Sequence, residues 1–194
     1  MSQAESLELI QAQPFGLLTT SEKDRITQAF LPFIFDQKEH CLFGHLAKQN
    51  EQIDAIADSQ NSSVTFQGEH AYISPSWYES SQQVPTWNYQ AVKVRGVAHL
   101  LNHQETLKVI TDLSNHHEQQ FDEPWTMGKL SQKKIDAMLR AIVGIRIDIL
   151  EIVGINKMSQ NKTEPDQMTV VTGLKNQPDN SSRKVAEIID KGRG

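Results

Sequence analysis

The run GHLAKQN at residues 44–50 is the part of the sequence best suited to binding an anion. It lies where a predicted strand meets a predicted helix, and backbone N–H groups at the start of a helix attract negative charge. Lys48 would add a cation, and His45 can hydrogen-bond a ligand oxygen in either charge state. These residues predict a phosphate site. The alternative interpretation is an ordinary helix cap with an exposed lysine.

A second candidate is the segment 74–89, which is rich in serine, proline and aromatic residues. Loops of this length inside a compact domain are often functional. Trp87 could stack on a planar ligand, and Asn88 could hydrogen-bond that ligand. The alternative interpretation is that the tryptophans of this loop only cover one end of a barrel.

A third candidate, KMSQN at residues 157–161, follows the last predicted strand. It places a cation, a hydroxyl group and two amides in one short run, which suits an anion or the polar edge of a heterocycle. A polar turn is the alternative interpretation, and the residue pattern alone favours it.

Other kinds of chemistry lack their usual sequence patterns. His99 and His103 are four residues apart, but the pair straddles a predicted strand–helix junction, so a metal site is not expected. No G-x-S-x-G nucleophile turn, G-x-G-x-x-G run or Walker loop is present. The sequence therefore contains no evident catalytic constellation.

Composition narrows the classes of protein further. The 194 residues are 38 % hydrophobic, so the chain can bury a core, and the net charge is −5. That charge argues against binding nucleic acid by bulk electrostatics, and no basic recognition helix is present. The single cysteine, Cys41, excludes an internal disulfide and fits a reducing, cytoplasmic location. No apolar run is long enough to span a membrane, and the first residues do not resemble a signal peptide.

Hydrophobic periodicity predicts the elements that position these candidates. We expect helices over 2–13, after Asn50, over 101–119 and over 131–143, with Asn102 and Ser131 as caps. Gly144 would stop the last of these helices. The predicted strands are 15–20, 26–35, 41–46, 63–66, 71–73, 92–100 and 145–153.

Three positions in the predicted strands carry structural expectations of their own. Pro32 cannot donate to a strand ladder, so its strand must be an edge or contain a bulge there. The glycine at position 96 predicts a bulge in its strand, and the sequence 67–69 predicts a turn between two short strands.

The predicted fold is mainly β, a small antiparallel β-barrel with peripheral α-helices. Strands dominate the first hundred residues, and no parallel strand–helix–strand rhythm occurs. We expect one domain over 1–174 and a polar, mobile tail over 175–194, with a short helix over 185–189 as an alternative.

Seven runs spread over most of the chain resemble the PaiB family, the FMN-binding negative transcriptional regulators. They are AQPFGLLTT (12–20), LPFIFD (31–36), LFGHLAKQN (42–50), VTFQGEHAYISPSWY (64–78), VPTWNYQAVKVRG (84–96), MLRAIVGI (138–145) and KMSQNK (157–162). The fourth and fifth runs are long and specific to the family.

The resemblance implies an antiparallel FMN-binding split barrel, similar to pyridoxamine-phosphate oxidases, that forms a homodimer with FMN at the subunit interface. A strand would run along the isoalloxazine, a second group would surround the phosphate, and a third would close the site, partly from the other subunit. In that order the groups are Phe30, Leu31, Pro32 and Phe33; His45, Leu46, Lys48 and Asn50; and Trp87, Asn88, Lys157, Ser159, Gln160 and Asn161. Glu51 and Ile53 replace the Pro-x-Trp that usually follows in the family.

Three functions remain open at this point. The first is a flavin-based sensor or negative transcriptional regulator acting as a homodimer. The second is an enzyme, either an FMN-dependent oxidoreductase or a haem-degrading protein with this barrel. The third is a binding module that has lost flavin. DNA binding is suggested by the family name, while neither the charge nor any motif supports it.

Overall fold

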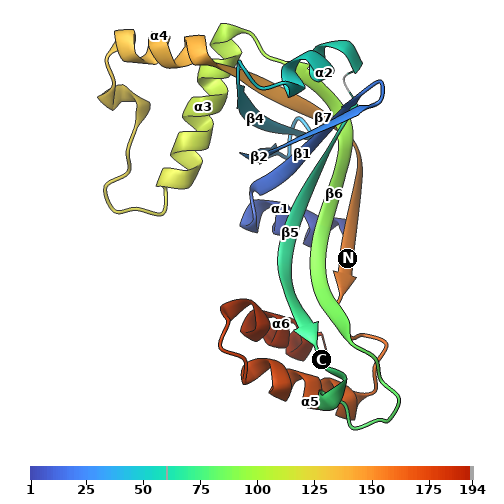
Figure 1. Cartoon of the computed structure of the whole chain (residues 1–194). Coiled ribbons are helices and arrows are strands. Elements are labelled where there is room, and N and C mark those ends of the chain that lie inside the picture. The colour runs from blue at the N-terminus through green and yellow to red at the C-terminus, as the bar shows by residue number, and fades with distance from the viewer. Residues whose placement is uncertain (60, 193–194) are drawn as a thin grey trace. The chain divides into compact units, whose positions relative to one another are not determined.

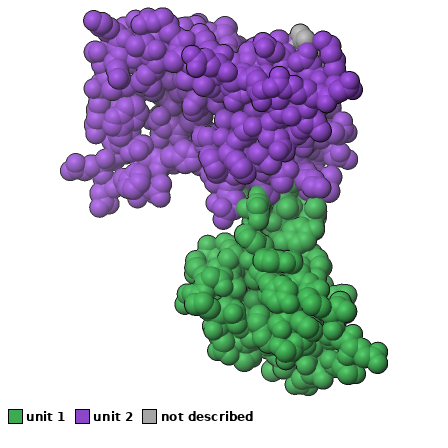
Figure 2. Space-filling view, in the orientation of Figure 1, with its two compact units in different colours: residues 1–9, 67–92, 154–194 green, residues 10–66, 93–153 purple. Residues whose placement is uncertain are grey.

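The computed structural model describes residues 1–59 and 61–192, which fold into two compact units (Figure 2). Unit 1 comprises residues 1–9, 67–92 and the described part of 154–194, and unit 2 comprises residues 10–66 and 93–153. The strands form one sheet in the order β2-β1-β5-β6-β7-β4-β3, with β2 and β3 as its ends (Figure 1). The sheet is open, and the mainly β, split-barrel prediction is confirmed.

Strand β1 pairs with β2 and β5, and β4 pairs with β3 and β7, each pair being antiparallel. The strands are β1 (Phe15–Glu22), β2 (Arg25–Pro32), β3 (Ile34–Asp36), β4 (Cys41–Ala47), β5 (Asn61–Ile73), β6 (Thr86–Leu100) and β7 (Ile142–Lys157). The boundary between the units falls within β5, β6 and β7, so each of these strands contributes to both units.

Pro32 is the last residue of β2, an end strand of the sheet, which confirms the edge position expected of it. The next residue, Phe33, donates a backbone hydrogen bond to the Pro14 carbonyl at 2.8 Å and buries its ring. That ring packs edge-on against Phe66, with 5.8 Å between ring centres. A side chain at Gly44 on β4 would press on the Phe33 ring, so glycine lets β4 approach the end of β2.

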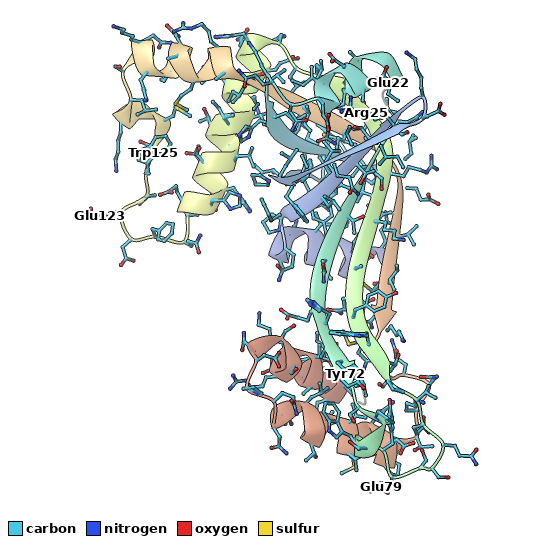
Figure 3. All side chains as sticks on the ribbon, viewed as in Figure 1. Glu22, Arg25, Tyr72, Glu79, Glu123 and Trp125 are labelled. Carbon is cyan, nitrogen blue, oxygen red and sulfur yellow. The ribbon has the colours of Figure 1, made fainter. Side chains whose placement is uncertain are left out.

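The helices of unit 2 are α2 (Gln52–Ser59), α3 (His103–Glu118) and α4 (Gln132–Ala141). Asn102 caps α3 in a capping box, and Ser131 caps α4, as the sequence predicts. A short 3-10 turn, Met127–Lys129, follows the segment that carries Trp125 (Figure 3). Trp125 packs on the small core that α3 and α4 share.

Unit 1 has its own core between strand ends and helices. The helices are most of α1 (Gln3–Ala12), the 3-10 turn Pro75–Trp77, α5 (Glu164–Lys175) and α6 (Asn180–Lys191). Ala71 and Ile73 of β5 pack with Leu174 and Ile189 of the two C-terminal helices. Asp166 fastens a loop to α5: its carboxylate accepts hydrogen bonds from the hydroxyl and backbone N–H of Ser80, which lower its pKa.

Two local expectations differ from the structure. Residues 67–69 lie within the continuous strand β5, because a glycine at 68 leaves room for Leu9 and Gln90 to pack closely. The helix α4 ends at Ala141, and Gly144 lies inside β7, where its backbone N–H donates to the Thr106 hydroxyl at 2.9 Å. A side chain at this position would press on Thr106, so the glycine serves close packing and does not stop a helix.

The segment 175–194, expected to be a polar tail, contains α6. Asp179 caps this helix, and Val185, Ala186 and Ile189 are buried on one face of it. This spacing of apolar residues explains the helix, which includes the 185–189 alternative. Residues 193–194 lie outside the described residues. The division into one domain over 1–174 and a tail stays a prediction.

Candidate functional site

The second half of β4 has one edge that β3 does not cover. β3 pairs only with residues 41–43 of β4, whereas β7 pairs with the whole of β4. Leu46 points into the core, and His45 points to the opposite face. The chain then leaves the strand at Lys48, whose backbone N–H donates to the Ala141 carbonyl at 2.9 Å.

His45 presents a polar atom that has no partner. Its Nδ1 atom is buried and makes no hydrogen bond within the described part of the chain. Burial lowers the pKa of the imidazole, because removal from water disfavours the charged form. At neutral pH the ring is therefore neutral and can donate or accept one hydrogen bond from a ligand.

Lys48 and Asn50 stand at the entry to α2. Lys48 is exposed, and its ammonium forms no ion pair with the described residues. Asn50 caps the helix, as predicted: its side-chain oxygen accepts a hydrogen bond from Gln52 N–H at 2.9 Å. The Gln52 side chain is buried and donates to the Leu18 carbonyl at 3.2 Å, which ties this helix start to the sheet.

Glu51, the acidic departure from the family pattern, is engaged by a basic residue. It forms an ion pair with Arg25, which lies at the β1–β2 hairpin next to Glu22 (Figure 3). This pairing offsets the negative charge that Glu51 places near Lys48.

The residues predicted to run along a flavin ring alternate between surface and core. Leu31 and Phe33 are buried, so their side chains belong to the core of unit 2. Phe30 is 62 % exposed and stacks on Phe15 with 5.6 Å between ring centres. Phe30 and Pro32 are thus the members of this group that have surface to offer a ligand.

The remaining predicted residues lie in unit 1. Trp87 is on β6, which begins at Thr86, and not in a loop as expected. Its ring is 54 % exposed and lies edge-on to Tyr72 of β5, with 5.9 Å between ring centres. Tyr72 is labelled in Figure 3. His70 flanks the same ring at 6.2 Å. Unit 1 therefore carries an exposed aromatic cluster made of His70, Tyr72 and Trp87.

Asn88 holds the polar segment 157–161 in place. Its buried amide donates to the Ser159 hydroxyl at 2.8 Å. Ser159 adopts a left-handed backbone with φ of 61°, a conformation that costs about 1 kcal/mol or more outside glycine. The side-chain oxygen of Gln160 accepts a hydrogen bond from the backbone N–H of Met158 at 2.7 Å, which closes the turn. These contacts leave the side chain of Asn161 at the surface.

Lys157 ends β7 and donates to the Thr86 hydroxyl at 2.5 Å. It is exposed, so its remaining two ammonium protons are open to a ligand. Of the third predicted group, Trp87, Lys157, Gln160 and Asn161 are exposed in unit 1. The side-chain amide of Gln160 is already engaged with the backbone of Met158 and Asn156.

The donor set fits a flavin nucleotide in two separate groups. Unit 2 supplies a free cation and the buried, unpartnered Nδ1 atom, which suit a phosphate. Unit 1 supplies an exposed indole, which suits a planar ring. Sequence reasoning missed Tyr72 and His70. Their signal was alternation around the buried Ala71 within the run HAYIS, which places both on one face of a strand.

Two kinds of feature were not found among the described residues. These residues contain no cluster of three or more histidine, cysteine, aspartate or glutamate side chains arranged to hold a metal ion. None of their helices is both long and apolar enough to cross a bilayer.

Comparisons with known proteins identify the family of the chain. A family model described as "Putative FMN-binding domain" matches residues 1–151. The protease synthase and sporulation protein PAI 2 of Bacillus subtilis (strain 168) is 36 % identical over 183 residues, covering 93 % of this chain and 88 % of that protein.

Solved structures extend the likeness at the level of fold. The FAD- and haem-binding protein of Mycobacterium smegmatis matches with a TM-score of 0.63 at 12 % identity, covering 89 % of this chain and 78 % of that chain. A chain from Listeria innocua described as a "Putative Pyridoxamine 5'-phosphate oxidase" matches with a TM-score of 0.52 at 16 % identity. The match covers 79 % of this chain and 97 % of that chain.

At such low identities the solved structures establish the split-barrel fold alone, while the family model and the PAI 2 relative carry the relationship. On these grounds the chain belongs to the PaiB family of FMN-binding domain proteins, with FMN as its cofactor.

Proposed function

We propose that the phosphate of FMN binds non-covalently at the junction of β4 and α2. The observation that carries this proposal is the buried Nδ1 of His45, which has no partner among the described residues, close in sequence to the exposed ammonium of Lys48. A phosphate oxygen would satisfy both groups. Asn50 and the backbone of Leu46 complete the proposed cradle, together with the uncovered edge of β4.

The isoalloxazine ring is proposed to lie along Phe30–Phe33, with the exposed surfaces of Phe30 and Pro32 in contact with it. Trp87, Lys157 and Asn161 are proposed to contact the flavin of a partner copy, with Asn88, Ser159 and Gln160 as the residues that position them. The site would then require a homodimer.

The proposed role is that of a flavin-based sensor or negative regulator of transcription in the cytoplasm. FMN, when bound, supplies reversible electron and hydride chemistry. The chain adds residues that bind and orient the flavin, and His45 is its one buried unpaired imidazole in that region of the described structure. Regulation through protein partners fits better than direct DNA contact, since the net charge is −5.

The phosphate site is tested by titrating the purified chain with FMN and following flavin absorbance and fluorescence. We expect Lys48→Ala to weaken FMN binding by about tenfold or more, because a charge-assisted hydrogen bond to phosphate is lost. Lys93→Ala removes an exposed lysine of β6 and should leave the affinity unchanged. Equal affinity of the two variants would remove Lys48 from the site.

The contribution of the partner copy is tested by mixing two variants, Lys48→Ala and Trp87→Ala. If the two residues serve one flavin from different copies, a mixed dimer contains one intact site, and about a quarter of all sites should recover at equal mixing. Absence of recovery, when both variants exchange subunits, would place the two residues in different sites or on the same copy.

A further inference from the structure

Unit 2 contains a cavity of about 430 Å³ that none of the candidate flavin residues lines. It opens among β3, β4, β7 and α3 and lies within the size range of roughly 300–1,000 Å³ that is typical of small-molecule sites. Its apolar lining comes from Ile34, Phe43, Leu101 and Val109. Seven charged side chains complete the lining: Asp36, Lys38, Glu39, Glu105, Lys108, Asp112 and Arg146.

Arg146 is held in a fixed orientation at the wall of this cavity. Its Nε atom donates to Asp148 at 2.7 Å, and its guanidinium lies 5.8 Å from the centre of the Phe43 ring. The nearest further carboxylate, that of Glu39, is 3.6 Å from a terminal nitrogen, beyond hydrogen-bond reach. Neither terminal nitrogen donates a hydrogen bond within the described residues, although Nη1 forms an ion pair with Glu39 and the side chain is only 31 % exposed.

Three of the carboxylates in the lining are engaged elsewhere. Asp36 accepts the backbone N–H of Glu39 at 2.9 Å, and Glu105 completes the capping box of α3. Asp112 pairs with Lys108 at 2.8 Å. Each of these three carboxylates therefore has a partner within the described residues, which leaves donors of the remaining cations available to a ligand.

Two cations supply those donors. Besides Arg146, Lys38 is exposed and forms no ion pair with the described residues. The remaining carboxylate, Glu39, has a side chain that is 52 % exposed and can turn into solvent. Once Glu39 has turned away, the planar guanidinium of Arg146 has the geometry that binds a ligand carboxylate through two parallel hydrogen bonds.

We propose that this cavity binds a small organic acid, with its carboxylate on the terminal nitrogens of Arg146 and its compact apolar body against Phe43, Leu101 and Val109. Burial of a ring or branched alkyl group against the apolar wall is favourable, and the guanidinium binds the anionic end. The proposal does not depend on flavin binding, because no residue of the proposed flavin site takes part.

Benzoate is a suitable probe, titrated into the full chain by calorimetry or ligand-observed NMR. We expect saturable binding of benzoate and much weaker binding of benzylamine and benzyl alcohol, which carry the same ring on a cationic and a neutral head. Arg146→Gln should weaken benzoate binding by about tenfold or more. Arg95→Gln, which alters an exposed arginine of β6 outside the cavity, is the matched control and should have no effect.

Arg146→Lys guards against a folding defect in the glutamine variant. It keeps the charge beside Asp148 and loses the planar fork, so benzoate binding should still fall while the thermal midpoint stays close to that of the unmodified chain. Failure of benzoate to bind, equal binding of benzylamine, or unchanged affinity in both Arg146 variants would overturn the proposal.

Flavin competition separates this inference from the proposed function. Benzoate affinity measured with and without saturating FMN should be the same. If FMN displaced benzoate, the cavity would be part of the flavin site and the proposal of a separate acid site would fall. If FMN failed to bind at all, the flavin proposal would fail and the benzoate result would still stand or fall alone.

Discussion

At the scale of residues, His45 has a buried ring nitrogen without a hydrogen-bond partner among the described residues, and this atom carries the proposal of a phosphate site. The residue types at 45–50 predict the candidate groups of this segment from the sequence alone. Which of their atoms lack partners could not be read from it, because that depends on long-range packing. Leu46, Leu31 and Phe33 illustrate the limit: as members of matching runs they were site candidates, yet their side chains fill the core.

The lowered pKa of His45 predicts a pH dependence of stability. Because the folded pKa lies below the unfolded value near 6.5, the unfolded chain binds the proton more readily as pH falls through that value. The contribution of His45 to the free energy of unfolding is therefore fully present above about pH 6.5, and it is lost as the pH falls through the folded pKa. Urea unfolding at pH 7.5 and 5.5 should give a smaller difference for His45→Leu than for the unmodified chain; an equal or larger difference would contradict this.

At the scale of elements, glycine positions control how closely the strands and helices approach. A side chain at Gly96 on β6 would collide with the backbone carbonyl of Asp148 on β7, and backbone cannot move aside easily. Gly128, in a 3-10 turn, faces open space by comparison.

We expect Gly96→Ala to lower the free energy of unfolding by about 1–3 kcal/mol, the usual cost of overpacking. Gly128→Ala should change it by no more than about 0.5 kcal/mol. Chemical denaturation of both variants measures the difference. A Gly96→Ala variant as stable as the control would show that β6 and β7 separate at little cost.

The capping box of α3 offers a second test at this scale. The side-chain oxygen of Asn102 accepts a hydrogen bond from the backbone N–H of Glu105 at 3.0 Å. The Glu105 carboxylate in turn accepts one from the backbone N–H of Asn102 at 2.8 Å. We expect Asn102→Ala to cost about 1 kcal/mol. Ser114→Ala, later in the same helix, is the comparison, since its hydroxyl only bonds back to Ile110. Thermal melts of the two should differ.

Local signals account for most of the elements that the sequence predicts. The caps Asn102, Ser131 and Asn50 and the edge proline Pro32 stand where their residue types indicate. The misjudged boundaries depend on tertiary contacts. A turn was expected at Gly68 from residue type alone, whereas the structure uses this glycine for close packing inside a strand.

At the scale of the whole molecule, the proposed interface between copies is measurable directly. Sedimentation equilibrium at micromolar concentration should give about twice the chain mass of 21.9 kDa. A monomer under these conditions, with FMN present, would contradict the proposed two-copy flavin site.

DNA contact is the other property tested on the intact protein. With a net charge of −5, we expect no specific band in a gel-shift titration at physiological salt, with or without FMN. A specific band that weakens steeply with added salt would instead favour direct repression.

The interleaving of the two units along the chain has a consequence for biosynthesis. Unit 1 is assembled from three stretches, and its last stretch includes the helices α5 and α6. Ala71 and Ile73 emerge from the ribosome well before Leu174 and Ile189, which bury them. Until those helices have been translated, the apolar end of β5 stays uncovered, so nascent chains should depend most on chaperones during the synthesis of the final third.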